Sequence, residues 1–89
     1  MSEQEAKTDQ PPPAQPALYR IGELAERAGV SRQVVSTYCM YGLLKESART
    51  PGGQRLFDES AARRIRLIRD LKRRYTLREI REIFIRDRL

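Results

Sequence analysis

The apolar residues that follow Leu18 repeat at the spacing of two short helices with a tight turn between them. One helical face, with residues at i, i+3, i+4 and i+7, comprises Ile21, Leu24, Ala25 and Ala28. Gly29 stands where helices commonly end, and Ser31 is a good N-cap for a second helix over roughly residues 32–41. Gly42 is expected to end this second helix. Two short helices joined by about three residues that include a glycine predict a helix-turn-helix.

The pattern becomes extended after the second helix and leads to a turn. The run Thr50-Pro51-Gly52-Gly53 has strong turn chemistry, and polar and apolar residues alternate over positions 54–57. These features predict a two-stranded β-hairpin, or wing. Its glycine tip would let the backbone approach a partner closely, because no side chain intervenes. A plain turn whose glycines only satisfy the backbone geometry is the alternative.

Two further helices are predicted in the last third of the chain. Asp58 can cap the first, with Phe57 before it as a hydrophobic staple onto Ala62. Its inner face comprises Ala61, Ile65, Ile68 and Leu71 or Lys72. Thr76 and Glu79 match a capping box that opens the second helix. The apolar stripe of that helix comprises Leu77, Ile80, Ile83 and Phe84.

The first 16 residues differ from the rest. They contain four prolines and, after Met1, no valine, isoleucine, leucine or aromatic residue. Such a segment buries too little apolar surface to offset its ordering entropy. We expect residues 1–17 to form a disordered, Pro-rich tail, either passive or a ligand for another protein. Residues 18–89 are predicted to be one mainly α domain, a winged helix-turn-helix with four helices and a two-stranded β-hairpin wing.

The charge distribution indicates a polyanionic partner. The chain carries a net charge of +6, and residues 17–89 hold 17 cations against nine acids, a net charge of +8. Fifteen of the 18 cations are arginines, whose planar donor fork matches phosphate groups and guanine edges. A solvated surface with ion pairs along the helices is the alternative.

The candidate DNA contacts lie on the second helix, on the hairpin and at the start of the third helix. A helix that enters the major groove needs short and medium polar side chains near its start. Those of the second helix are Ser31, Arg32, Gln33, Ser36, Thr37 and Tyr38. The hairpin and its flanks contribute Lys45, Arg49, Gly53, Gln54 and Arg55, and the third helix contributes Arg63.

Individual roles follow from side-chain chemistry. Gln33 can read adenine, and Arg32 can read guanine or hold a phosphate. Tyr38 is expected to keep its ring in the core and offer its hydroxyl to a phosphate, while Val34, Val35 and Tyr41 turn towards the first helix. The alternative is an ordinary amphipathic helix with a polar outer face.

Catalysis and metal binding find little support in the composition. The chain has no histidine, so the commonest general base and metal ligand is missing. Cys39 is the single cysteine and is interpreted as a packing residue, which suits a reducing cytoplasm. No apolar run approaches the roughly 20 residues that span a bilayer. We therefore expect a cytoplasmic, nucleoid-associated protein that is not an enzyme and needs no cofactor or metal.

A family resemblance adds to this interpretation. The segments that carry it are Tyr19–Ala25, Gly29-Val30-Ser31, Tyr38, Gly42-Leu43-Leu44, Arg49–Phe57 and Tyr75–Ile80. Their order and spacing resemble the DNA-binding domain of MerR-type transcriptional regulators over residues 18–85. The resemblance implies a winged helix-turn-helix that binds operator DNA as a dimer. In that family the recognition helix enters the major groove and the wing grips the backbone.

The sequence departs from the family pattern at several places. It reads Ser36-Thr37-Tyr38-Cys39 where the family usually has Arg-Tyr-Tyr-Glu, so the operator cannot be carried over. Gln54 stands where an aromatic residue is common, and Arg20 where a Ser or Thr cap is common. The long dimerising helix would follow residue 89, which suggests either a piece of a longer regulator or a minimal member of the family.

Two other functions remain open at this point. Small basic winged helices also serve as architectural factors of the excisionase type, which bend DNA. Alternatively, the apolar residues of the last helix could dock another protein or a second copy of the chain. That surface would comprise Ile80, Ile83, Phe84 and Ile85.

Overall fold

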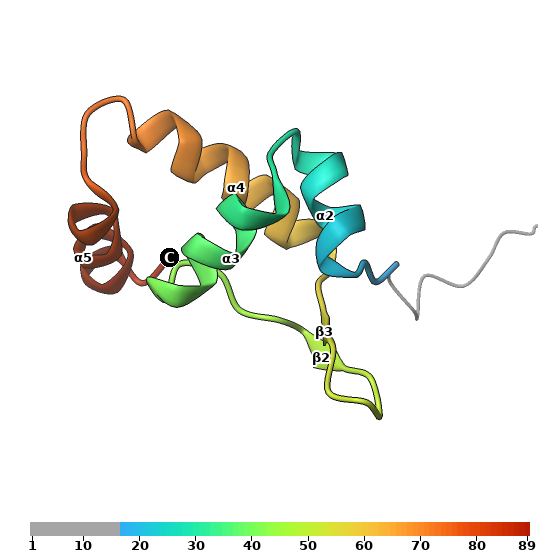
Figure 1. Ribbon diagram of the computed structural model, residues 1–89. Coiled ribbons are helices and arrows are strands. Elements are labelled where there is room, and N and C mark those ends of the chain that lie inside the picture. Colours follow the sequence, from blue (N-terminus) through green and yellow to red (C-terminus); the bar gives the residue numbers. More distant parts are fainter. Residues whose placement is uncertain (1–16) are drawn as a thin grey trace, which may run out of the picture.

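The computed structural model describes residues 17–89, which form four helices and a two-stranded hairpin that projects from one side (Figure 1). The elements are α2 (Ile21–Ala28), α3 (Arg32–Met40), β2 (Ala48–Arg49), β3 (Arg55–Leu56), α4 (Glu59–Leu71) and α5 (Leu77–Asp87). The predicted mainly α class with a β-hairpin is confirmed. The tail predicted over residues 1–17 lies outside the described residues, apart from Ala17. In the described part of the chain, no helix has the length and apolar character to span a membrane.

The turn between α2 and α3 forms where the sequence places its glycine and its cap. Gly29 adopts a left-handed conformation with φ of 73°, and the following amide donates to the Ala25 carbonyl at 2.9 Å. Ser31 begins α3, because its Oγ accepts a hydrogen bond from the Val34 amide at 3.1 Å. Such a cap contributes about 1 kcal/mol. After α3, Gly42 turns the chain away with φ of 75°.

The hairpin is short and antiparallel. Its register places Ala48 opposite Leu56 and Arg49 opposite Arg55. The Gly53 amide closes the turn by donating to the Thr50 carbonyl at 2.9 Å. Gly53 has φ of 89°, a conformation that residues with a side chain rarely adopt. The predicted turn is thus confirmed, and the glycine is needed there for backbone geometry.

The start of the described chain is tied to the end of the hairpin and to α4. Tyr19 and Phe57 form an antiparallel bridge with amide–carbonyl distances of 2.7 and 2.8 Å. Glu59 on α4 accepts hydrogen bonds from the Tyr19 hydroxyl at 3.2 Å and from Arg27 Nη2 at 2.8 Å. The Arg27 guanidinium also lies 4.7 Å from the centre of the Tyr19 ring. These contacts fix α2 against α4 at the base of the wing.

Both later helices begin at their predicted caps. The Asp58 carboxylate accepts from the Ser60 amide at 2.9 Å and begins α4. At α5 the capping box is complete, since Thr76 Oγ1 accepts from the Glu79 amide at 3.1 Å. The Glu79 carboxylate accepts in return from the Thr76 amide at 2.8 Å. The two predicted helix starts are therefore confirmed at the level of individual hydrogen bonds.

The core takes side chains from all four helices and from the end of the hairpin. The largest fully buried ones are Phe57, Leu24, Leu43, Ile65, Ile68, Ile80 and Val35. Tyr41, expected to face the first helix, is 40% exposed, because it is the C-cap of α3, where the chain leaves the helix. The docking surface expected on the last helix is also smaller than predicted. Ile80 and Phe84 belong to the core, Ile83 is half-buried, and Ile85 is 62% exposed.

Candidate nucleic-acid interface

The outward face of α3 is polar over its first two turns. Arg32 and Gln33 are exposed, and Ser36 and Thr37 are half-buried. Gln33 Nε2 lies 3.5 Å from Thr37 Oγ1, which it can use as a long hydrogen-bond acceptor. Val35 on the opposite face is fully buried in the core. The helix therefore presents to solvent the polar face that the sequence predicts for contact with base edges.

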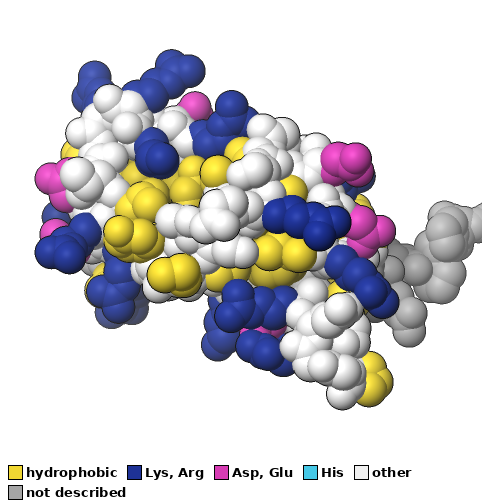
Figure 2. Space-filling model, in the orientation of Figure 1, with side chains coloured by type: hydrophobic (Ala, Val, Ile, Leu, Met, Phe, Trp, Pro, Cys, Tyr) yellow, Lys and Arg dark blue, Asp and Glu magenta, His cyan; other side chains and the backbone are white. Residues whose placement is uncertain are grey.

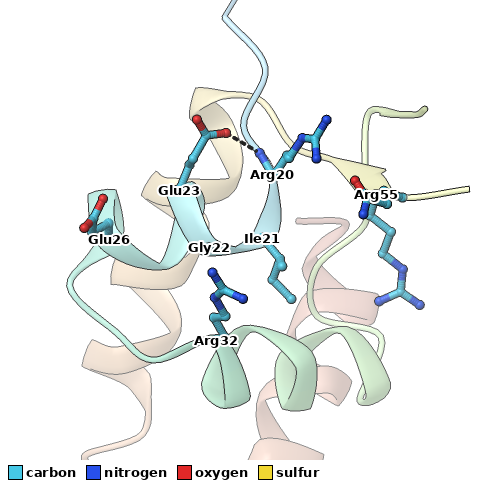
Figure 3. Close-up of a pocket in the computed structure, with 8 residues that line it drawn as sticks. Arg20, Ile21, Gly22, Glu23, Glu26, Arg32 and Arg55 are labelled. Atoms are coloured by element: carbon cyan, nitrogen blue, oxygen red, sulfur yellow. Dashed lines mark hydrogen bonds between the residues drawn. The ribbon is translucent and has the colours of Figure 1, made fainter. Parts of the chain in front are cut away.

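Arg32 reaches from α3 towards the first turn of α2 and lies against Gly22 (Figure 3). A Cβ added to Gly22 would come within 2.7 Å of Arg32 Nη2 and 2.9 Å of Nε. The Arg32 guanidinium thus occupies the space that a Cβ at position 22 would fill. The sequence pattern predicts Arg32 as a DNA contact but gives Gly22 no role. A glycine inside a helix is itself a signal, because it costs roughly 0.5–1 kcal/mol relative to alanine.

An open hollow of about 630 Å³ connects this point with the hairpin (Figure 3). Its lining comprises Arg20, Ile21, Gly22, Glu23, Glu26, Arg32, Gln54 and Arg55. Arginines enter it from three places: the residue before α2, the start of α3 and β3. Glu23 caps α2 by accepting from the Arg20 amide at 2.8 Å. A complete capping box would also need the Arg20 side chain to accept a hydrogen bond from the Glu23 amide. Arginine cannot do this, because its side chain has no acceptor.

The wing arginines surround one carboxylate, that of Glu46. Arg49 Nε donates to Glu46 Oε2 at 2.9 Å, and Arg49 Nη1 donates to the Gly53 carbonyl at 3.2 Å. Arg55 Nε lies 3.9 Å from Glu46 Oε1. A hydrogen bond from its own backbone and another from Arg49 hold the pKa of Glu46 below its ordinary value. Figure 2 shows this mixture at the base of the hairpin, where several Lys and Arg side chains gather with an acidic one among them.

Arg55 also connects the wing to α3. Burial raises the pKa of the Cys39 thiol, and the positive charge of Arg55 lowers it in part. Figure 3 shows the Arg55 side chain extending from β3 towards α3, and its Nε lies 3.9 Å from Glu46 Oε1 on the hairpin side. Because Arg55 shares the hollow with Arg32 as well, the polar helix face and the wing cations lie on the same side of the molecule.

Tyr38 does not fit its predicted role. Its side chain is only 3% exposed and belongs to the core, so its hydroxyl is not presented to a phosphate. Burial raises the pKa of this hydroxyl, and the charge of Arg69 lowers it in part. Helical periodicity placed Tyr38 at the border of the buried face, but it could not show that tertiary packing buries the whole side chain. We therefore remove Tyr38 from the candidate contacts.

The remaining predicted contacts are exposed. They are Ser31, Lys45, Gly53, Gln54 and Arg63. Ser31 is already used as the cap of α3, and Arg63 lies on α4 outside the hollow that joins α3 to the hairpin. Within residues 17–89, no group of three or more His, Cys, Asp or Glu side chains is arranged to hold a metal ion.

Arg64, which follows the candidate residue Arg63 on α4, makes contacts within the protein. Its Nε donates to the Leu43 carbonyl and its Nη2 to the Leu89 carbonyl, both at 2.7 Å. Its guanidinium lies 4.4 Å from the centre of the Phe84 ring. The side chain thus ties α4 to the end of α5 and to the segment that leads into the wing.

The exposed polar helix, the glycine-closed turn before it and the basic hairpin beside it define a winged helix-turn-helix protein. The comparisons with known proteins specify the family. Residues 19–86 match the family described as MerR HTH family regulatory protein. The chain belongs to this family.

Relatives and solved structures agree with this assignment. The chain is 43% identical over 65 residues to the nodulation protein NolA of Bradyrhizobium elkanii, covering 72% of this chain and 30% of NolA. The transcription regulator PbrR691 from Ralstonia metallidurans CH34, solved in complex with lead(II), superposes with a TM-score of 0.69 at 43% identity. That match covers 79% of this chain and 56% of PbrR691.

A second structural neighbour was solved on DNA. HiNmlR, a MerR family regulator lacking the sensor domain and bound to promoter DNA, superposes with a TM-score of 0.68 at 26% identity. The match covers 75% of this chain and 54% of HiNmlR. The chain thus spans about a third of the nodulation protein, and about half of each structural neighbour.

Proposed function

We propose that this chain binds double-stranded DNA sequence-specifically and acts in transcription regulation, with α3 in the major groove and the wing on the phosphate backbone. One observation carries the proposal: Arg55 of the wing and Arg32 of α3 line the same hollow. A duplex that receives the polar face of α3 would therefore meet the wing cations at the same time. Family membership and the promoter-bound relative support the same function.

The residues divide into two groups by chemistry. Gln33, Ser36 and Thr37 carry the groups that read base edges in the groove, with Gln33 suited to adenine. Arg32 holds a phosphate or reads guanine. The wing side chains Lys45, Arg49 and Arg55, with Gly53 and Gln54 at its tip, meet the backbone and carry no sequence information directly. Ser31 and Arg63 remain weaker candidates at the edge of this surface.

Selection of bound duplexes from a random library, followed by electrophoretic shifts, tests the proposal. Arg55→Ala should weaken binding to every duplex and flatten the salt dependence by about 0.9 in the slope of log K against log salt. Gln33→Ala should change the preference among sites. Arg86→Ala, on α5, is the matched control for loss of one positive charge. Failure of the chain to enrich any sequence would refute the proposal.

We also propose that the chain forms a homodimer or meets a protein partner through α5, and that it works at the nucleoid in the cytoplasm. Ile85 and Leu89, which are 62% and 54% exposed, are the apolar residues that support such a contact. An inverted repeat in the selected sites would support a dimer, whereas a single half-site would indicate a monomer. The proposal assigns the chain no catalytic step.

A further inference from the structure

Glu46 lies between the two wing arginines that the proposed function places on the DNA backbone. Its Oε2 accepts from Arg49 Nε at 2.9 Å, and its Oε1 lies 3.9 Å from Arg55 Nε. Arg49 and Arg55 face each other across the register of β2 and β3, so one carboxylate contacts cations from both strands. The side chain of Glu46 is 21% exposed, whereas those of Arg49 and Arg55 are 53% and 43% exposed.

A carboxylate at this position opposes the binding of a polyanion. It reduces the net charge of the three-residue group from +2 to +1 and repels nearby phosphates. These ion pairs should contribute little to the stability of the fold, because both arginine side chains are roughly half exposed. The turn is closed independently, since the Gly53 amide donates to the Thr50 carbonyl. Its arrangement between the two guanidiniums therefore calls for a function in binding.

We propose that Glu46 is a specificity-determining residue of the wing, which holds Arg49 and Arg55 in position and offsets one of their charges. This inference rests on the proposed function. Binding to arbitrary DNA is driven by the number of phosphates that the protein neutralises, and offsetting one charge weakens it. Binding to the correct site depends on geometry, which guanidiniums held in advance favour because less side-chain freedom is lost. The carboxylate thus raises the ratio of the affinity for the correct site to the affinity for arbitrary DNA.

Other features of the wing also position the two arginines. Arg49 Nη1 donates to the Gly53 carbonyl at 3.2 Å, which ties this guanidinium to the wing tip. Arg55 Nε lies 3.9 Å from Glu46 Oε1, and the Arg55 side chain lines the hollow that Arg32 of α3 also lines. Glu46 contacts both guanidiniums, which makes it the residue to test.

The test uses the full chain, a site that the wild type selects from a random library, and an unrelated duplex of equal length. Glu46→Gln removes the charge, Glu46→Asp keeps it but shortens the side chain by one methylene, and Glu82→Gln removes the same charge on exposed α5. Glu46→Gln should bind the unrelated duplex roughly 2- to 8-fold tighter near 0.1 M salt, with a slope steeper by up to about 0.9. Its affinity for the selected site should rise less, so that the ratio of the two affinities falls.

The other two variants separate charge from geometry. Glu46→Asp should keep the wild-type salt slope on the unrelated duplex and lose affinity for the selected site. If Glu46→Gln changes both affinities by the factor seen for Glu82→Gln, with the wild-type slope, the inference is overturned while the proposed function stands. A wild type that binds no duplex, or binds both equally, overturns the proposed function as well.

A measurement without DNA tests the positioning role alone. In the wild type, the Arg49 Nε–H should give a slowly exchanging NMR signal, because it is hydrogen bonded to Glu46. Glu46→Gln should shift this signal and speed its exchange, because a neutral amide oxygen accepts more weakly than a carboxylate. An Arg49 signal that is unchanged in the variant would contradict the contact on which the inference depends.

Discussion

Gly22→Ala tests whether the position of the Arg32 guanidinium matters for DNA binding. The added Cβ would come within 2.7 Å of Arg32 Nη2, 2.9 Å of Nε and 3.0 Å of Cζ. Ordinary van der Waals contact begins near 3.4 Å, so the guanidinium must move by several tenths of an ångström or leave the site. Because Arg32 is the end of a flexible side chain and not a backbone segment, the fold should survive the change.

The expected effects on stability and on binding have opposite signs. Alanine in a helix is favoured over glycine by roughly 0.5–1 kcal/mol, and the first turn of α2 should show the lower part of that range. A gain of about 0.5 kcal/mol would raise the melting temperature by roughly 2–4 °C in a domain of this size. Displacement of one arginine contact should cost about 0.5–1.5 kcal/mol of binding, a loss of roughly 2- to 13-fold in affinity.

Thermal unfolding and electrophoretic shifts with the selected site measure these two effects. Arg32→Ala and the double variant complete a mutant cycle, in which Gly22→Ala should have little further effect on binding once Arg32 is gone. Wild-type affinity in Gly22→Ala would refute the reasoning. The same affinity loss with and without Arg32 would also refute it, because the glycine would then act through something other than this contact.

Three shorter predictions concern stability. Ser31→Ala should cost about 1 kcal/mol in urea unfolding, because it removes the cap of α3, whereas Ser31→Asp should keep most of that energy. Hydrogen bonds from two serines hold the pKa of Asp58 below its ordinary value. The contribution of the Asp58 carboxylate to folding stability is therefore complete above its pKa in the unfolded chain, about 3.9, and is lost as pH falls through its lower pKa in the folded protein. Asp58→Asn should flatten this part of the pH–stability curve. Arg64→Ala should cost about 1.5–3 kcal/mol, with Arg64→Lys recovering only part, because lysine cannot reach the Leu43 and Leu89 carbonyls together.

Local chemistry explains why much of the fold could be predicted from the sequence. Helix starts at Ser31, Asp58 and Thr76 and the left-handed stop at Gly29 depend on one residue and its near neighbours along the chain. The structure contains each of them. The order of helices and hairpin followed from these signals together with apolar spacing at periods of about 3.6 and 2 residues.

Contacts between distant segments explain what could not be predicted. Gly22 and Arg32 are ten positions apart, and nothing in the spacing shows that a guanidinium lies against the glycine. Tyr38 lies at the border of a helical face, where periodicity alone cannot decide between burial and exposure. Glu46 is an acid in a segment whose lysine and arginines predict DNA binding, so its own role was not expected. Its position between Arg49 and Arg55 depends on the hairpin register.

The size of the hairpin explains why the wing and α3 should act as one unit. Strands of two residues each are too short to be stable alone, since even longer isolated hairpins are marginal in water. The wing must therefore take its position from its ends. Phe57 is fully buried in the core and bridged to Tyr19, and Arg55 lines the same hollow as Arg32 of α3. A substitution that moves Arg55 without removing its charge should consequently change which sites are selected as well as how tightly they bind.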